Sequence, residues 1–223
     1  MARFTRIEVV LKMRETGLIP VFYNNDEHVC REVIKASYNG GVRVFEFTNR
    51  GDYAHEIFIS ISKWVRKEFP DLMLGAGSVM DAGTASLFIQ SGADFIVSPV
   101  LNPDVIRTCN RRKVLCIPGC GTLSEISSAE ELGAEIVKIF PGTAVGGPGF
   151  VKAVKGPCPW TSIMPTGGVE PVEKNLKEWF DAGVTCVGMG SALITERIIR
   201  SADWKKMSED IKTTIEIIKK IRS

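Results

Sequence analysis

Residues 135–141 read EIVKIFP, a run rich in β-branched residues that predicts a buried strand with one lysine, Lys138, in its middle. Lysine is almost never fully buried without a partner, so its place here needs an explanation. One explanation is structural: the strand end is open and the alkyl chain carries the amine to solvent. The other is chemical, because an amine in a poorly hydrated pocket can condense with a carbonyl at neutral pH. The rest of the sequence favours the chemical explanation.

Length and composition predict one domain, residues 1–223, with a single large core. Hydrophobic residues make up 44% of the chain, and single α/β barrels commonly have this length. The 28 basic and 26 acidic side chains are mixed along the chain and leave a net charge of +2, which gives no basic stripe for nucleic acid. No apolar run is long enough to cross a bilayer. The expected partner is a small molecule, with no nucleic acid and no membrane.

Six cysteines are scattered through the chain with no secretory signal before them, so we expect free thiols in a reducing cytoplasm. Cys116 and Cys120 have a C-x3-C spacing, but the two histidines, His28 and His55, are far from them in the sequence. A structural zinc ion requires four ligands, which this spacing does not supply. No metal site is therefore predicted.

Strand and helix patterns alternate along the chain after a helical segment at 3–16 that ends at Gly17. Eight strands are predicted, at 18–22, 42–47, 73–76, 94–97, 114–117, 136–140, 162–164 and 186–189. Helical segments follow them at 26–39, 53–69, 81–91, 103–112, 124–132, 150–154, 171–182 and 204–221. The chain is thus a series of strand–helix units.

Strands that alternate with helices at this spacing form parallel sheets through crossover connections. Eight units that close on themselves give the (β/α)8 TIM barrel, an α/β fold, here with the 3–16 helix as an N-terminal lid. A doubly wound open sheet is the alternative. Catalytic groups of a barrel lie where strands end and the following loops begin, so we expect a site at the strand ends.

A carboxylate and an arginine stand at the end of the second strand, in Glu46-Phe47-Thr48-Asn49-Arg50. Side chains alternate along a strand, so Val44, Glu46 and Thr48 share a face. If that face points into the barrel, Glu46 lies in apolar surroundings, where a carboxylate needs a partner or a use. It could form a buried ion pair with Arg50 or Lys138, and such pairs often mark functional sites.

Glycine-rich turns follow three other strands: Gly75-Ala76-Gly77-Ser78, Pro165-Thr166-Gly167-Gly168 and Gly188-Met189-Gly190-Ser191. In barrels, the loops after strands seven and eight often bind phosphate through backbone N–H groups. Tight turns without a ligand are the alternative. The positions of the last two turns favour an anion site.

The ordered set of these motifs resembles the 2-keto-3-deoxy-6-phosphogluconate (KDPG) / 4-hydroxy-2-oxoglutarate (KHG) aldolase family. The resemblance runs from about residue 17 to residue 195. The motifs that carry it are Glu46-x-Thr48-x-Arg50, Gly75-Ala76-Gly77-Ser78-Val79, Ser98-Pro99, Ile117-Pro118-Gly119, Val137-Lys138-Ile139-Phe140-Pro141, Pro165-Thr166-Gly167-Gly168 and Gly190-Ser191.

This resemblance implies a class I aldolase, a carbon–carbon lyase, on a (β/α)8 barrel, with no metal or cofactor, in a homotrimer. Lys138 matches the lysine that forms the Schiff base, Glu46 the general acid/base, and Arg50 the group that holds the pyruvyl carboxylate. Ser78 stands where the family usually has a threonine that contacts the same carboxylate. The remaining matches are the pocket-lining Phe140 and Pro99, and a distal phosphate site at Thr166, Gly167, Gly168, Gly190 and Ser191.

The implied reaction is the reversible cleavage of 2-keto-3-deoxy-6-phosphogluconate into pyruvate and glyceraldehyde 3-phosphate. After the first strand, many relatives carry an arginine that meets the phosphate, whereas this chain has Phe22-Tyr23-Asn24. The difference leaves 4-hydroxy-2-oxoglutarate and the phosphorylated galactonate analogue as alternative substrates. A phosphate-ester-binding barrel without catalysis is the alternative outside the enzymes.

Overall fold

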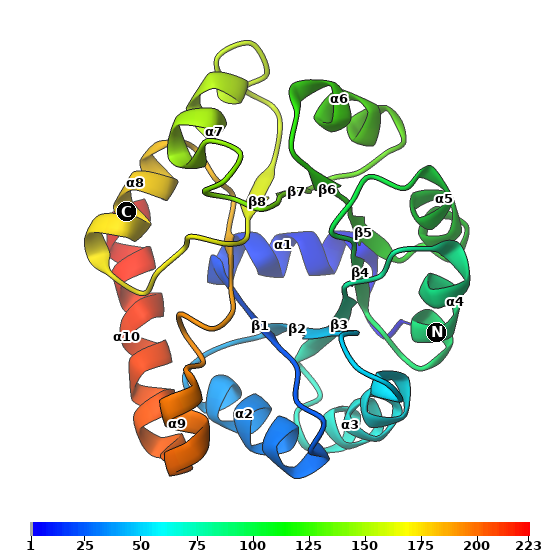
Figure 1. Ribbon diagram of the computed structural model, residues 1–223, viewed down its shortest axis with the longest axis vertical. Helices are drawn as coiled ribbons and strands as arrows, with labels where there is room; N and C mark the ends of the chain where they lie inside the picture. The colour runs from blue at the N-terminus through cyan, green and yellow to red at the C-terminus, as the bar shows by residue number, and fades with distance from the viewer. Residues whose placement is uncertain (1) are drawn as a thin grey trace.

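A computed structural model describes residues 2–223, and it shows parallel strands surrounded by helices (Figure 1). The alternation predicted from the sequence is confirmed. The strands are β1 (Leu18–Phe22), β2 (Val44–Thr48), β3 (Met73–Gly77), β4 (Phe95–Val97), β5 (Leu115–Ile117), β6 (Gly119–Cys120), β7 (Val137–Ile139), β8 (Ile163–Pro165) and β9 (Val187–Met189).

Helices connect the strands, and most begin at a residue whose side chain caps the first turn. Asp26, Asp81 and Thr122 each accept a hydrogen bond from a backbone N–H of the first turn, which supplies a partner that the helix itself cannot. The helices are α1 (Arg6–Thr16), α2 (Glu27–Asn39), α3 (Ala54–Glu68), α4 (Ala82–Gln90), α5 (Pro103–Arg112), α6 (Leu123–Glu131), α7 (Gly147–Lys155), α8 (Glu173–Asp181), α9 (Glu196–Ser201) and α10 (Trp204–Arg222).

The strands form two parallel sheets, one in the order β5-β4-β3-β2-β1-β9 and one in the order β6-β7-β8. The two sheets are joined at two places. At one edge, β5 continues into β6 through a single residue, Pro118, which has no backbone N–H. At the other edge, Thr166 bridges Gly188 of β9, and the Thr185 N–H donates to Ile163 O of β8 at 2.8 Å.

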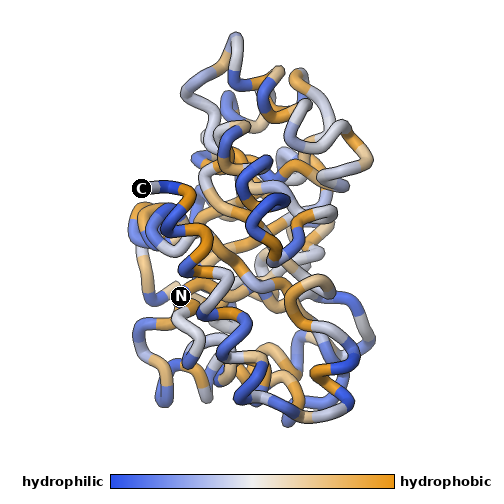
Figure 2. Tube along the Cα trace, turned by 90° about the vertical axis from the view of Figure 1, so that its left-hand side faces the viewer, coloured by the Kyte–Doolittle hydropathy of each residue, from blue (hydrophilic) through white to orange (hydrophobic). Residues whose placement is uncertain are grey.

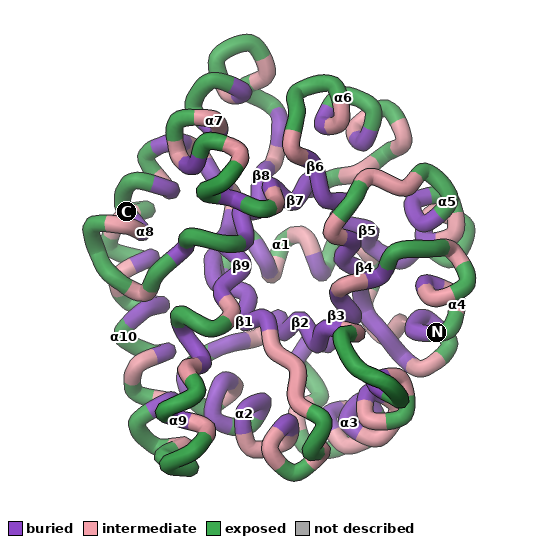
Figure 3. Tube along the Cα trace, viewed as in Figure 1, coloured by how far each residue is buried: buried purple, intermediate pink, exposed green. Residues whose placement is uncertain are grey.

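Buried residues divide into an inner and an outer hydrophobic cluster, because successive side chains of a strand point to opposite faces. Val44 belongs to the inner cluster, and its neighbours Phe45 and Phe47 belong to the outer one, between sheet and helices. In Figure 3 the strands around the centre are largely buried, and in Figure 2 the orange, hydrophobic segments concentrate in the middle of the molecule.

Helix α1 packs against the inner cluster through Val9 and Met13, which are fully buried. In Figure 1 it crosses behind the centre of the strand arrangement. Ile7 and Leu11 of the same helix are exposed. The buried side of α1 is therefore formed by Val9 and Met13, while Ile7 and Leu11, two of the apolar residues at helical spacing in the sequence, face solvent.

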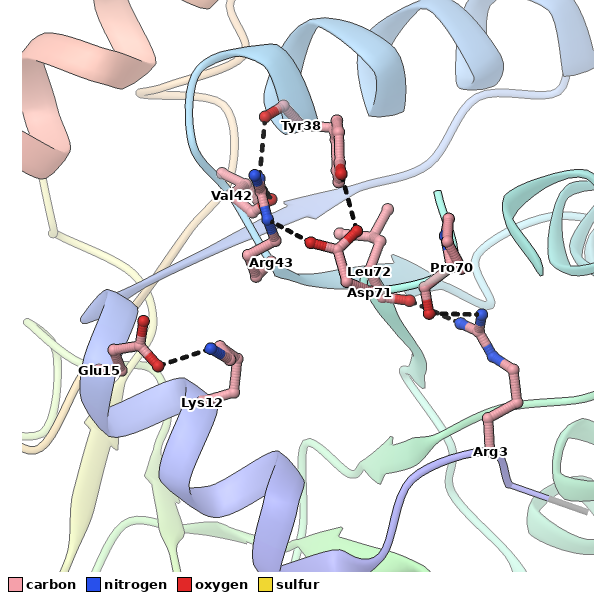
Figure 4. Close-up of polar contacts among 9 residues, drawn as sticks. All are labelled: Arg3, Lys12, Glu15, Tyr38, Val42, Arg43, Pro70, Asp71 and Leu72. Carbon is pink, nitrogen blue, oxygen red and sulfur yellow. Dashed lines mark hydrogen bonds and ion pairs between the residues drawn. The ribbon is translucent and has the colours of Figure 1, made fainter. Parts of the chain in front are cut away.

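Polar contacts tie the chain start to the loops that precede β3 and β4, and Figure 4 shows those with the loop before β3. Arg3 donates to Leu72 O at 2.6 Å and pairs with the fully buried Asp94 at 3.1 Å. Asp94 also accepts from the Leu74 N–H at 3.1 Å. Nearby, Arg43 pairs with Asp71 at 2.8 Å, and the Tyr38 hydroxyl donates to the same carboxylate at 2.7 Å.

Three elements differ from the sequence prediction. Helix α7 begins at Gly147 rather than at residue 150, with Pro148 in its first turn, where a missing N–H is tolerated. The predicted strand 114–117 is followed by the separate two-residue strand β6. Helix α9 was not predicted, because six residues are too few to show a helical period. Within residues 2–223, no helix has the length and apolar character needed to cross a bilayer.

We expect Arg3→Ala to lower the free energy of unfolding by about 3 kcal/mol, because it leaves the buried Asp94 carboxylate without its cation. Arg200→Ala is the control, since Arg200 pairs with Glu196 on the surface, where such a pair contributes less than about 1 kcal/mol. Urea denaturation measures both. Equal midpoints for the two variants would show that the Arg3 contacts do not stabilise the fold.

Candidate active site

Lys138 lies in the middle of β7, and its side chain is on the inner face. Its neighbours Val137 and Ile139 belong to the outer cluster, so alternation directs Lys138 inward. The backbone is held on both sides, since Lys138 is in register with Gly119 of β6 and Met164 of β8. Only 5% of Lys138 is exposed. The amine therefore does not reach solvent along the strand edge, which rules out the structural explanation above.

The Lys138 amine faces a buried carboxylate, that of Glu46 on β2. Glu46 is 0% exposed, and its Oε1 lies 3.6 Å from Lys138 Nζ. Neither carboxylate oxygen has a hydrogen-bond partner among the described residues. A buried carboxylate normally has such partners, whereas this one has only the ion pair with Lys138. The sequence left Arg50 and Lys138 as possible ion-pair partners of Glu46, and the structure shows the pair with Lys138.

Two glycines of β3 make the space for this arrangement. A Cβ on Gly77 would overlap Glu46 Oε1, and a Cβ on Gly75 would overlap the Phe95 ring. The sequence indicated that these glycines let backbone approach a ligand. The structure gives another reason, because they let neighbouring side chains of the chain itself approach the backbone. Ser78, directly after β3, has a φ of 58°, in the left-handed region that is uncommon for residues other than glycine.

A cavity of about 430 Å³ opens at the ends of the strands, and neither Lys138 nor Glu46 lines it. Phe140 relates the cavity to this pair, since Phe140 lines the cavity and its ring centroid lies 5.2 Å from Lys138 Nζ. Arg50 also lines the cavity; it is exposed, and its guanidinium makes no hydrogen bond or ion pair to a residue in the described part of the chain. The cavity is lined by Val21, Phe22, Tyr23, Thr48, Arg50, Phe140, Thr166, Gly167, Gly168, Val169, Gly188, Gly190, Ser191, Ala192 and Ile194.

The two glycine-rich turns predicted to form an anion site both line this cavity. Gly167 and Gly168 have φ values of 93° and 78°, which side chains other than glycine rarely adopt. Thr166 is buried, and its Oγ1 has no hydrogen-bond partner among residues 2–223. The Gly142 N–H donates to Thr166 O at 2.8 Å, which attaches the loop after β7 to this turn.

Seven of the predicted site residues line the cavity: Arg50, Phe140, Thr166, Gly167, Gly168, Gly190 and Ser191. Four do not: Lys138 and Glu46, which form the buried pair, and Ser78 and Pro99, which follow β3 and β4. The sequence did not identify the cavity residues Val169 and Ile194. It signalled Tyr23 only through the segment Phe22-Tyr23-Asn24, which stands in place of the arginine expected from the family resemblance, and it assigned Tyr23 no role.

Within the described residues, no group of three or more His, Cys, Asp or Glu side chains is placed to hold a metal ion. Cys116 and Cys120 are both buried, and none of the six cysteines forms a disulfide. The site thus offers an amine, a carboxylate, a guanidinium and backbone donors. These groups suit chemistry on an anionic carbonyl compound.

The sequence matches the family described as KDPG and KHG aldolase over residues 9–209. The chain belongs to this family of aldolases. Among its relatives, the 2-dehydro-3-deoxy-phosphogluconate aldolase of Haemophilus influenzae is 30% identical over 216 residues, which cover 97% of this chain and 99% of that protein. The KHG/KDPG aldolase of Escherichia coli K12 is 30% identical over 89% of this chain and 91% of its own length.

Solved structures agree with this membership. The KDPG aldolase of Legionella pneumophila, captured with pyruvate as a covalent carbinolamine, superposes with a TM-score of 0.83 at 28% identity, covering 92% of this chain and 97% of that one. The KDPG aldolase of Zymomonas mobilis ZM4, with 3-phosphoglycerate, has a TM-score of 0.79 at 27% identity, covering 93% and 94%. The α/β fold with its parallel strands is therefore shared with family members.

We expect iodoacetamide at pH 8 to modify Cys158 first in the native protein, since Cys158 is the one cysteine that is not fully buried. Burial raises the pKa of Cys30, Cys120 and Cys186 to about 12, so these thiols stay protonated as well as shielded. Peptide mass spectrometry after a short exposure measures the labelling, with a urea-unfolded sample as the control. Native labelling of Cys120 as fast as that of Cys158 would contradict the packing of β6.

Proposed function

We propose that the chain is a class I aldolase that reversibly cleaves 2-keto-3-deoxy-6-phosphogluconate into pyruvate and glyceraldehyde 3-phosphate. The observation that carries the proposal is the buried pair of Lys138 and Glu46, 3.6 Å apart, with both carboxylate oxygens free of hydrogen bonds. Family membership and relatives with this name support the substrate.

In this proposal Lys138 is the nucleophile. Its amine, in the uncharged form, adds to the C2 ketone to give a carbinolamine, and loss of water gives an iminium ion. The iminium draws electrons from the adjacent bonds, so the bond between C3 and C4 can break. Burial beside the Phe140 ring keeps water away from the intermediate.

Glu46 moves the protons. As a base it takes the proton from the C4 hydroxyl, and the electron pair of the C3–C4 bond passes to the iminium nitrogen while the aldehyde leaves. The protonated Glu46 then returns the proton to C3 of the enamine, and hydrolysis frees pyruvate from Lys138. A carboxylate with no hydrogen bonds to other groups can serve both steps, provided that it lies within reach of C3 and C4.

Arg50 is proposed to bind the pyruvyl carboxylate. Its guanidinium lines the cavity unpaired and can donate two parallel hydrogen bonds to a carboxylate. Ser78 is proposed to support the same carboxylate, and Phe140 and Pro99 to shape the pocket, although Ser78 and Pro99 do not line the cavity. The distal phosphate would lie at the two turns that contain Thr166, Gly167, Gly168, Gly190 and Ser191, where backbone N–H groups suit an anion.

4-Hydroxy-2-oxoglutarate and the phosphorylated galactonate analogue are the alternative substrates. The family takes its name from KHG as well as KDPG, and the relative in Escherichia coli is named for both. The ratio of kcat/KM values for the candidates decides among them.

We also propose that the two sheets close into one eight-stranded (β/α)8 barrel, with β5 and β6 acting as one strand and α1 as a lid. The Pro118 junction and the contacts of Thr166 and Thr185 support closure. We propose a single domain over 1–223, a homotrimer and a cytoplasmic location. The free cysteines support a reducing compartment, and light scattering would test the trimer.

Borohydride reduction in the presence of pyruvate should attach a reduced three-carbon unit to Lys138, because reduction traps the iminium. Peptide mass spectrometry locates the adduct. Lys155 is the control, since burial lowers the pKa of its amine but it donates to Pro159 O and Thr161 O and does not line the cavity. If the enzyme turned over the substrate in the presence of a chelator but formed no adduct on Lys138, the Schiff-base mechanism would be refuted. An adduct that formed on Lys155 to the same extent as on Lys138 would also refute it.

Arg50→Lys should raise KM for the 2-keto acid by about tenfold or more, because a lysine cannot make the two parallel hydrogen bonds that a guanidinium makes to a carboxylate. Loss of one hydrogen bond to a charged group costs about 1.5–3 kcal/mol. Steady-state kinetics measures the change. Arg31→Lys is the control, since Arg31 pairs with Glu27 on the surface of α2. An unchanged KM would mean that another group binds the carboxylate.

A further inference from the structure

Tyr23, which the proposed mechanism does not use, occupies a central place at the cavity. It follows β1, which lies between β2 and β9 in the sheet. The register pairs Phe22 with Phe47 of β2 and Pro20 with Met189 of β9. Tyr23 therefore emerges between the strand end that carries Arg50 and the turn that carries Ser191, and all three line the cavity.

The Tyr23 ring is fixed from two sides. Its edge meets the Phe47 ring, with centroids 5.6 Å apart, and its hydroxyl lies against the Cα of Gly51, where a Cβ would overlap it. Gly51 directly follows Arg50, so the absence of a side chain at Gly51 decides where the phenol lies relative to the guanidinium.

The Tyr23 hydroxyl makes no hydrogen bond to any residue in the part of the chain that the structure describes, unlike that of Tyr38, which donates to Asp71 at 2.7 Å. A half-buried phenol normally finds a partner for its O–H. At the wall of a cavity, that partner can be a ligand.

The charges around the cavity indicate what the ligand group is. Arg50 is the single charged side chain among the described residues that line it. The proposed substrate carries two anionic groups, a carboxylate and a phosphate. If Arg50 binds the carboxylate, the phosphate must be held by neutral donors, and the phenol of Tyr23 is one that lines the same cavity as the turns with Gly168 and Ser191.

We propose that Tyr23 is a substrate-binding residue that donates its O–H to the distal phosphate and thereby sets the preference for phosphorylated over unphosphorylated 2-keto acids. The inference rests on the proposed function and adds to it a determinant of specificity.

Tyr23→Phe removes the hydroxyl and keeps the ring contact with Phe47. We expect KM for 2-keto-3-deoxy-6-phosphogluconate to rise about tenfold, as for the loss of one hydrogen bond to a charged group, with kcat changed less than about twofold. KM for the unphosphorylated 2-keto-3-deoxygluconate should stay within about twofold, because it lacks the phosphate. Tyr53→Phe is the matched control, since Tyr53 is 70% exposed and lies outside the cavity.

Gly51→Ala tests the same inference without changing Tyr23. The new Cβ displaces the phenol, the movable end of a side chain, and the φ of Gly51 is not in the positive range, so the fold should persist. KM for the phosphorylated substrate should rise as in Tyr23→Phe, with an unchanged Tm. Trapping of pyruvate on Lys138 should be unaffected in both variants, because pyruvate has no distal group.

Calorimetric titration with glycerol 3-phosphate gives a readout that needs no catalysis, with an expected loss of affinity of about tenfold in Tyr23→Phe. Unchanged affinity in Tyr23→Phe, or an equal rise in KM for both sugar acids, would overturn the role of Tyr23. The proposed function would still hold in that case if the wild type turned over the substrate and formed the Lys138 adduct. If the wild type gave neither turnover nor adduct, the proposed function would fail, and the titration would still decide whether Tyr23 binds a phosphate ester.

Discussion

The burial of an amine and a carboxylate in one apolar interior is the constraint on which the rest of this structure depends. Either charge alone would be strongly destabilising there, and together they are tolerable only if their separation is controlled. At 3.6 Å, Lys138 and Glu46 attract each other without a short hydrogen bond. The pair is thus less well satisfied than ordinary buried ion pairs, in which further hydrogen bonds offset the cost of removing the charges from water.

The surrounding residues fix the distance between the Lys138 amine and the Glu46 carboxylate. Glu46 can occupy its place because Gly77 has no side chain, and Lys138 is fixed because its backbone pairs with strands on both sides. The Lys138 amine also lies beside the Phe140 ring, whose centroid is 5.2 Å from Nζ. Precision at the pair therefore comes from the rigid sheet, while the loops form the cavity.

The sequence predicted much of this architecture, because period-two alternation and the spacing of glycines are local properties. Glu46 and Lys138 stood out as charges in strands that are otherwise apolar, and the structure confirms that they meet. What alternation cannot predict lies beyond the strand ends. Tyr23 is positioned by contacts with Phe47 and Gly51, which are distant in the sequence, and Ser78 and Pro99 do not line the cavity. Helix α9 is too short to leave a periodic signal.

The division of the pair between two sheets has a mechanical consequence. Glu46 belongs to the sheet that contains β1 to β5 and β9, and Lys138 to the one formed by β6, β7 and β8. The distance between amine and carboxylate therefore depends on how the two sheets pack against each other, and not on the hydrogen bonds within either sheet. A small shift of one sheet relative to the other would change this distance while leaving the strand pairing within each sheet intact.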